Sequence, residues 1–365
     1  MPINVLHIST PASFRGGEQQ VSYLINSLVK FDITQFLICP KKAMLNDKID
    51  IEKCTIINHK KIKFISISLI IKTINMCFDN DISIIHAHDS KAQTVAVFVA
   101  FFSKKKIKVV VTRRVLFAVK GWLSKFKYKI KNVNKIICIS KAVELEMRKI
   151  VNLEKTIIIS SAINLNKFNT VDKKNFLFFK DSNIRVAYVA ALTYEKDHIT
   201  FLKTAKLILK TNKNITFYIV GEGKMRNEII AIIQKMNLEN NVVLTGFIKN
   251  ISSFILQMDY LLFTSKYEGL GTTILDFYLA KKPVITTLCG GNNEISLHKK
   301  TAMVSKVGDY KSLAKNFIAL HQNKLLKEKI VAEAYDLVIK NYSVDILGEN
   351  TFREYKKIVA PKVSI

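Results

Sequence analysis

The sequence lacks an apolar stretch long enough to cross a membrane. The longest candidates are residues 64–78, which include Lys72, and residues 92–102. Both are shorter than the roughly 18 to 20 apolar residues that a spanning helix needs. The first residues run directly into an apolar strand with no basic leader and no cleavage site, so we expect no secretion signal. We therefore expect a cytoplasmic protein.

Cysteine is sparse, and its spacing excludes two classes of site. The five cysteines lie far apart, mostly inside apolar runs, and form no Cys-x-x-Cys or Cys/His pattern. Disulfide frameworks and zinc sites need closer, regular spacing. We expect reduced cysteines that pack as small apolar side chains.

Acidic residues are few: 29 Asp and Glu stand against 57 Lys and Arg, giving a net charge of +28. The imbalance is greatest in residues 101–150, which hold 15 basic and 2 acidic residues. Such a field favours anionic partners, namely nucleic acid, acidic lipid head groups or phosphorylated sugars. A lysine-rich composition inherited from an AT-rich genome explains the charge equally well.

Short apolar runs alternate with helical patterns along the chain, which predicts parallel sheets covered on both faces. At 365 residues the chain is too long for one ordinary core. The alternation fails at residues 164–183 and restarts at 184, so we predict an α/β protein of two Rossmann-like, doubly wound domains. Their expected bounds are 1–170 and 171–344, with a terminal helix near 345–365 that packs back on the first domain.

A paired glycine follows the first predicted strand. Gly16 and Gly17 precede a predicted helix, where free amides can stabilise an anion. The loop has neither the Gly-x-Gly-x-x-Gly nor the P-loop lysine pattern, which argues against a dinucleotide oxidoreductase and a classical NTPase. Phosphate contact and a plain strand-to-helix turn are both open for this loop.

The most informative segment is residues 265–276, between two predicted strands of the second half. Glu268 lies in the loop, Gly269 and Gly271 expose backbone amides, and Asp276 comes about one turn into the next helix. One carboxylate can bind sugar hydroxyls and the other a ribose, with helix-terminal amides on the phosphates between them.

This segment resembles the Glu-x7-Glu signature of glycosyltransferase family 4, the group 1 transferases, in the form Glu-Gly-x-Gly-x-x-x-x-Asp. Further segments resemble that family in the same order: 16–18, 85–88, 139–141, 192–198, 220–223 and 290–294. The resemblance implies a GT-B fold with an inter-domain cleft, an acceptor-binding N-terminal domain and a donor-binding C-terminal domain. It also implies transfer from a nucleotide-sugar with retention of anomeric configuration.

By position in that family, Lys196 neutralises the diphosphate leaving group, Glu268 binds donor-sugar hydroxyls and Asp276 holds the ribose. A fixed lysine and helix amides then replace a divalent metal, so we expect no metal and no cofactor. The residues expected to bind the donor are Gly16, Gly17, Lys196, Gly221, Glu222, Glu268, Gly269, Leu270, Gly271, Thr272, Thr273 and Asp276.

Three positions depart from the family pattern. Asp276 is one methylene shorter than the usual glutamate. Ala191 stands where the family usually has an arginine, so one diphosphate cation is missing and donor binding is weaker unless another cation compensates. Arg114 stands near where many members have a histidine, and an arginine binds anions rather than acting as a base. We list Arg114 and His88 beside Glu268 and Lys196 as catalytic candidates, although His88 is as readily a structural histidine.

The acceptor side carries a basic amphipathic segment at residues 117–131. Val119, Leu123, Phe126 and Ile130 recur at helical spacing with lysines between them, a pattern typical of interfacial membrane binders. The alternative is a surface helix whose apolar stripe packs on the sheet. If the segment binds membrane, we expect a lipid-linked or lipopolysaccharide acceptor at the cytoplasmic face of the inner membrane.

Two other functions remain open from the sequence. A GT-B sugar-nucleotide epimerase shares the fold and needs no acceptor. A weakened transferase scaffold could bind membrane or nucleic acid through its charge, but no nucleic-acid recognition motif accompanies the basic residues.

Overall fold

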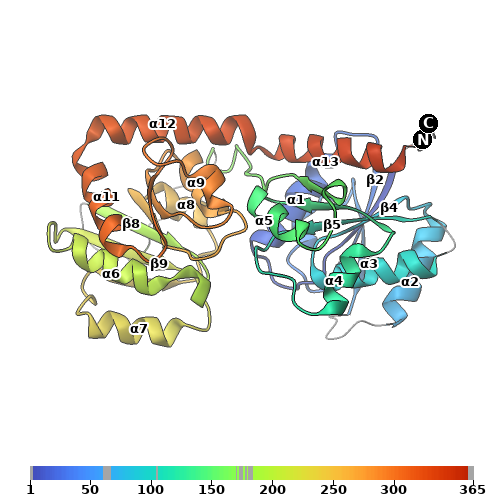
Figure 1. Ribbon diagram of the computed structural model, residues 1–365, viewed down its shortest axis with the longest axis horizontal. Helices are drawn as coiled ribbons and strands as arrows, with labels where there is room; N and C mark the ends of the chain where they lie inside the picture. Colours follow the sequence, from blue (N-terminus) through green and yellow to red (C-terminus); the bar gives the residue numbers. More distant parts are fainter. Residues whose placement is uncertain are drawn as a thin grey trace. The chain divides into compact units, whose positions relative to one another are not determined.

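The computed structural model describes residues 3–60, 67–103, 106–169, 171, 176, 179 and 184–360. It divides into two compact units (Figure 1). One comprises Met1–Ala162 with Val344–Ile365, and the other comprises Ile163–Ser343. Each is a parallel sheet covered by helices, so the predicted fold class of two doubly wound α/β units is confirmed.

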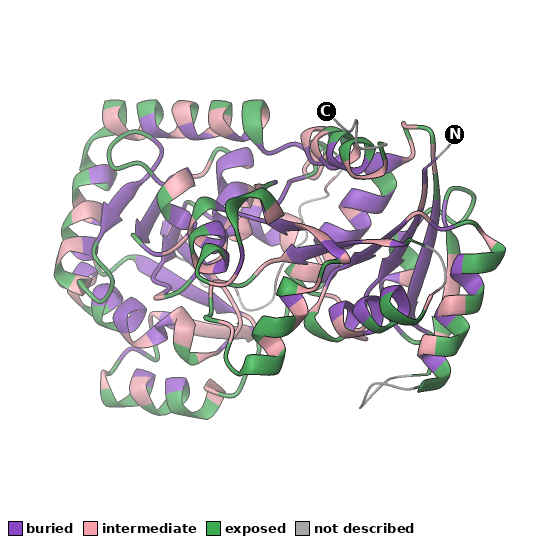
Figure 2. Cartoon of the chain, turned by 45° about the vertical axis from the view of Figure 1, so that its right-hand side comes forward, coloured by how far each residue is buried: buried purple, intermediate pink, exposed green. Residues whose placement is uncertain are grey.

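The N-terminal unit holds a seven-stranded parallel sheet in the order β3-β2-β1-β4-β5-β6-β7. Most of its strands are continuous apolar runs, because both faces of the sheet are buried. Figure 2 shows these strands in the buried colour. The strands are β1 (Ile3–Ile8), β2 (Ile33–Pro40), β3 (Thr55–His59), β4 (Ile84–Ala87), β5 (Lys108–Arg113), β6 (Val133–Cys138) and β7 (Thr156–Ile158).

Six α-helices and two short 3-10 turns belong to this unit. They are α1 (Gly16–Leu28), η1 (Asn46–Lys48), α2 (Ile67–Asp79), α3 (Ser90–Phe102), α4 (Trp122–Lys129), α5 (Lys141–Arg148), η2 (Leu153–Lys155) and α13 (Val344–Val359). The last of these packs beside α1 although more than 300 residues separate them (Figure 1). A Cβ atom at Gly348 would lie 2.6 Å from Ser27 Oγ, so the glycine permits the close approach.

The C-terminal unit holds a six-stranded parallel sheet in the order β10-β9-β8-β11-β12-β13. Its strands are β8 (Ile184–Val189), β9 (Ile215–Val220), β10 (Val242–Gly246), β11 (Tyr260–Phe263), β12 (Val284–Thr287) and β13 (Met303–Ser305). Its helices are η3 (Tyr194–Lys196), α6 (His198–Ile208), α7 (Arg226–Lys235), α8 (Ile251–Leu256), α9 (Thr272–Leu279), α10 (Asn292–Ile295), α11 (Tyr310–Gln322) and α12 (Lys324–Asn341).

The strand order reverses once in each sheet, between β1 and β4 in the first unit and between β8 and β11 in the second. In open α/β sheets, ligands bind outside the carboxyl ends of the strands at such a reversal. The loops after these four strands are therefore the places to look for a site in each unit.

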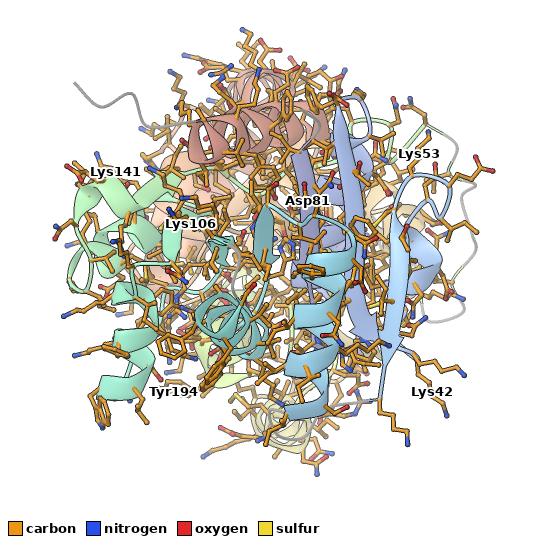
Figure 3. The ribbon with its side chains drawn as sticks, turned by 90° about the vertical axis from the view of Figure 1, so that its right-hand side faces the viewer. Lys42, Lys53, Asp81, Lys106, Lys141 and Tyr194 are labelled. Atoms are coloured by element: carbon orange, nitrogen blue, oxygen red, sulfur yellow. The ribbon has the colours of Figure 1, made fainter. Side chains whose placement is uncertain are left out.

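Charged side chains cover the exterior of the N-terminal unit, which faces the viewer in Figure 3. Exposed lysines such as Lys42 and Lys53 project outward from it. Across the described ranges, no helix combines the length and apolar character that crossing a membrane requires.

Candidate functional site

Lys196 and Glu268 meet at the strand reversal of the C-terminal unit. Lys196 Nζ lies 2.5 Å from Glu268 Oε1, and both side chains are largely buried. The same carboxylate oxygen accepts a hydrogen bond of 2.7 Å from Ser265 Oγ. An ion pair of this kind costs desolvation, which the short contact and the extra hydrogen bond offset. The loops after β8 and β11 thus bring together the two residues that carry the predicted donor chemistry.

The lysine is positioned by its backbone. Lys196 ends η3, and its carbonyl accepts hydrogen bonds from the hydroxyls of Tyr188 and Thr264. The next residue, Asp197, has a left-handed backbone with a φ of 51° and caps helix α6. These contacts turn the chain sharply, so the ammonium reaches the loop after β11.

A second cation, Lys266, contacts the segment around Lys196. Lys266 Nζ is 3.6 Å from an Asp197 carboxylate oxygen and 4.1 Å from the centre of the Tyr194 ring. Its backbone amide donates to the Glu195 carbonyl at 2.7 Å. Lys266 is therefore held against Tyr194, Glu195 and Asp197, the residues on either side of Lys196.

The glycine-rich turn after Glu268 is organised by Asn292. Asn292 is fully buried, and its Oδ1 accepts a hydrogen bond of 2.9 Å from the Gly271 amide. This amide is thus already occupied. Leu270 is buried, whereas Gly269, Thr272 and Thr273 stay partly exposed at the start of α9. Of this predicted phosphate-binding segment, Gly269 and the first turn of α9 are the parts left accessible.

Asp276 pairs with a lysine that the sequence did not single out. Lys167 Nζ lies 2.6 Å from Asp276 Oδ1, and the two side chains are 11% and 13% exposed. The partners are 109 residues apart. Lys167 falls in the segment predicted to be a linker, and no local pattern marks it. The predicted ribose carboxylate is therefore held by a cation.

Gly221 and Glu222 have structural roles in the described chain. A Cβ atom at Gly221 would lie 2.0 Å from the Ala190 carbonyl oxygen, so glycine is needed where the loops after β8 and β9 meet. The Glu222 side chain is half exposed and pairs with Arg226 at 3.0 Å.

In the N-terminal unit, Gly17 lies against Arg114. A Cβ atom at Gly17 would be 3.9 Å from Arg114 Cδ. Burial lowers the pKa of Arg114 to about 10, and the charge of Glu18 opposes that shift. Burial also raises the pKa of Glu18, whose carboxylate accepts the Arg15 amide at 2.8 Å. The guanidinium therefore stays charged at neutral pH beside the exposed Gly16 and the start of α1.

His88 belongs to a buried cluster of three histidines. His88 Nε2 lies 3.1 Å from His7 Nδ1, and the His86 and His88 ring centres are 4.2 Å apart. Burial lowers the pKa of His7 to about 3 and those of His86 and His88 well below the ordinary value. All three are therefore neutral at pH 7.

The three imidazoles are the one group in the described ranges whose ligand atoms gather closely enough to hold a metal ion, within 4.8 Å. Their surroundings do not fit a cation. Both ring nitrogens of His86 already contact hydroxyls, Tyr355 at 2.5 Å and Thr112 at 2.6 Å. The charge of Arg114 also contributes to the lowered pKa of His86. The cluster is better described as a packed core that fixes the ends of β1 and β4.

The predicted residues thus form two groups, one in each unit. Lys196, Glu268 and the start of α9 gather after β8 and β11 in the C-terminal unit, with Asp276 on α9. Gly16, Gly17, Arg114 and His88 gather after β1, β4 and β5 in the N-terminal unit. Sequence reasoning assigned no role to Lys167, Ser265 and Asn292. Ser265 contacts Glu268 within one loop, whereas Lys167 and Asn292 act through contacts with residues far along the chain.

Comparison with known proteins finds two family models that together match most of the chain. The model described as Glycosyl transferases group 1 matches residues 170–337, and the one described as Glycosyltransferase Family 4 matches residues 14–167. Each model falls almost wholly within one structural unit.

Curated relatives are similar over parts of their length. The chain is 25% identical over 224 residues to a poly(ribitol-phosphate) alpha-N-acetylglucosaminyltransferase of Staphylococcus aureus, covering 61% of this chain and 44% of that protein. It is 24% identical over 182 residues to the capsular polysaccharide biosynthesis glycosyltransferase CapM of Staphylococcus aureus, covering 50% and 48%. The chain spans about half or less of the length of these relatives.

Solved structures match over nearly the full chain. Anabaena HepE in complex with UDP and glucose superposes with a TM-score of 0.80 at 15% identity, covering 96% of this chain and 99% of that one. A glycosyltransferase from Rickettsia africae gives a TM-score of 0.81 at 18% identity, covering 99% of each chain. These likenesses confirm the expected GT-B fold.

Proposed function

Since this chain belongs to the group 1 glycosyltransferases of family 4, we propose that it transfers a sugar from a nucleotide-diphosphate donor to a cell-surface glycan. The observation that carries the proposal is the Lys196–Glu268 pair at the strand reversal of the C-terminal unit. A cation and a carboxylate held together there supply the charges that a diphosphate and a sugar hydroxyl need.

The proposed roles follow from charge and position. Lys196 neutralises the diphosphate as the bond to the sugar breaks, and Glu268 accepts hydrogen bonds from donor-sugar hydroxyls. Asp276 binds the ribose while Lys167 holds its carboxylate. With a fixed cation on the leaving group, the reaction needs no metal, and we propose that it retains the anomeric configuration. A UDP-sugar is the first donor to test, because HepE is similar in fold and was solved with UDP and glucose.

The proposed acceptor is an anionic or lipid-linked glycan. The two Staphylococcus aureus relatives are named for a poly(ribitol phosphate) and a capsular polysaccharide, both cell-surface polymers. In this chain, Arg114 places a charged guanidinium beside Gly17 in the unit proposed to bind the acceptor. Lipopolysaccharide is a further acceptor of the same class.

The proposal is tested by binding and product analysis of the purified protein. We expect one UDP-, GDP- or ADP-sugar to bind saturably with equal affinity in EDTA and in Mg²⁺. Incubation with that donor and an acceptor should give a product whose anomeric NMR coupling matches the donor. Epimerised donor without acceptor would point to the epimerase instead, and absence of binding to every nucleotide-sugar would refute the donor site.

The exposed face of α3 and α4 fits the surface of an anionic membrane. These neighbouring helices expose Phe101 (71%) and Trp122 (74%), together with Phe98, Phe102, Leu123 and Phe126. Tyr128 is the residue of α4 that is buried, so the Leu123–Phe126 stripe does not pack on the sheet. Because the exposed Lys125 and Lys129 lie on α4 among these side chains, acidic lipid head groups complement this face.

We expect the protein to co-sediment with phosphatidylglycerol vesicles and less with phosphatidylcholine vesicles. Trp122 is the single tryptophan, so its emission should shift to the blue on binding. Phe126→Ser should weaken binding about tenfold, since one aromatic side chain contributes roughly 1.5 kcal/mol or more when buried. The matched control is Leu145→Ser, an exposed leucine on α5. Equal binding to both lipids, or no blue shift, would remove the membrane from the proposal.

A further inference from the structure

A small polar cavity lies in the N-terminal unit between the start of α3, the end of β5 and helix α4. Its volume is about 180 Å³, and the polar residues that line it include Ser90, Gln93, Arg113, Lys120, Ser124 and Lys127. Pockets for whole drug-sized ligands begin at roughly 300 Å³. The cavity, called here the α3–α4 pocket, is therefore suited to one small group rather than to a whole saccharide chain.

The side-chain amide of Gln93, at the wall of this pocket, has no hydrogen-bond partner among the described residues. Its side chain is 0% exposed, yet neither the amide nitrogen nor the amide oxygen has a hydrogen-bond partner. A buried polar group without a partner costs about 1–3 kcal/mol. Buried amides almost always have a partner, so a hydrogen-bonding group that enters the pocket would be stabilised by Gln93.

The charges around the pocket identify the kind of group. Arg113, Lys120 and Lys127 line it, and none of the lining residues is acidic. The nearby Asp89 carboxylate is already occupied, because it accepts the Thr10 amide at 2.7 Å and the Lys91 amide at 2.9 Å. The three cations are therefore not matched by an anion within the pocket wall.

Lys127 is held facing the start of α3 by neutral oxygens. Its Nζ donates to Thr94 Oγ1 at 2.9 Å and lies 3.4 Å from the Ser90 carbonyl. Burial lowers its pKa, and the charge of Asp89 partly offsets that effect. An ammonium placed among neutral oxygens is stabilised when an anion enters beside it.

We propose that the α3–α4 pocket binds a phosphoryl group carried by the glycan acceptor. Gln93 donates its amide hydrogen to one phosphoryl oxygen, and Arg113, Lys120 and Lys127 neutralise the charge. The hydroxyls of Ser90 and Ser124 lie in the same wall. This inference rests on the proposed transfer function and names the chemical feature that selects the acceptor.

The test is calorimetric titration of the purified protein with inorganic phosphate and with glycerol 3-phosphate at fixed ionic strength. We expect saturable binding of both ligands. Lys120→Gln and Lys127→Gln should each weaken it at least tenfold, because each removes one of three charges from the wall. The matched control, Lys125→Gln, changes an exposed lysine of α4 outside the pocket and should bind like wild type.

Three outcomes would overturn the inference. These are no saturable binding, equal weakening by Lys125→Gln, or binding of inorganic phosphate without glycerol 3-phosphate, which would mark a free-anion site. Gln93→Leu preserves volume and should also weaken binding. Lys120 is exposed, so its variant tests the charge even if changes at buried Gln93 disturb folding. UDP-sugar binding is measured in parallel: its absence in wild type refutes the transfer function, whereas phosphate results report on the pocket alone.

Discussion

Lys196→Ala is expected to lower kcat for sugar transfer by about 10²- to 10³-fold, the loss typical when one group that stabilises transition-state charge is removed. Negative charge develops on the diphosphate as the sugar departs, and the Lys196 ammonium is the fixed cation held beside Glu268. Steady-state kinetics at saturating donor and acceptor measure this loss. Glu268→Gln should produce a comparable drop, because it keeps the oxygen that accepts from Ser265 but removes the charge.

Folding must be separated from chemistry in both variants. Removing one partner of a buried ion pair can cost about 3–5 kcal/mol of stability, because the remaining charge is left without compensation. Circular dichroism and donor titration at low temperature establish that each variant is folded. Lys206→Ala, an exposed lysine on α6, serves as the matched control and should keep full activity. Full transfer by folded Lys196→Ala and Glu268→Gln would show that the donor site lies elsewhere.

Acid should destabilise the N-terminal unit as the pH falls below about 6.5, so the loss begins well above the range in which most carboxylates titrate. Burial holds the pKa of His7 at about 3 and those of His86 and His88 well below 6.5. Below pH 6.5 the unfolded chain takes up protons on these imidazoles, whereas the folded unit does not. Stability is therefore complete above pH 6.5 and is lost as the pH falls toward the folded-state values.

The expected effect is large. His7, whose pKa is about 3, lowers the free energy of unfolding by about 1.4 kcal/mol per pH unit below pH 6.5, and the lowered pKa values of His86 and His88 add to this loss. Total stabilities are typically about 5–15 kcal/mol. Urea unfolding followed by circular dichroism between pH 7.5 and pH 5 measures the slope.

His88→Gln removes one imidazole that takes up a proton on unfolding. The slope of unfolding free energy against pH should therefore fall by about 1.4 kcal/mol per pH unit. Leu145→Ser, at an exposed leucine on α5 that carries no titrating group, should leave it unchanged. His198 adds a smaller loss in the C-terminal unit, since burial lowers its pKa to about 4. A urea midpoint that does not move between pH 7.5 and pH 5.5 would contradict the neutral cluster.

Local sequence patterns were sufficient to predict the central strands and the loops at their carboxyl ends. Runs such as Ile215–Val220 are apolar throughout, because both faces of a central parallel strand are buried. Two of the four edge strands, β3 and β13, were not predicted. β3 (Thr55–His59) has no fully buried residue, and β13 (Met303–Ser305) has three residues, so neither shows a continuous apolar run.

The partners within the sites could not be predicted from spacing. Lys167 reaches Asp276 across 109 residues, and Asn292 occupies the Gly271 amide from a separate loop. Phe179, in the segment predicted to be a linker, packs against Tyr218 and Phe254 of the C-terminal unit. The predicted helix over 117–131 is shorter in the structure, where α4 begins at Trp122, and this leaves room for the α3–α4 pocket beside it.

Helix α13 has a consequence for the order in which the protein matures on the ribosome. It is synthesised after the whole of the C-terminal unit, yet Leu347 and Tyr355 complete the core around Leu24 of α1. Tyr355 also supplies the hydroxyl that contacts His86. Since domains fold as their residues emerge, the C-terminal unit has its full sequence before the N-terminal unit does. The N-terminal unit therefore completes its core only after α13 has emerged, because Tyr355 both fills that core and contacts His86.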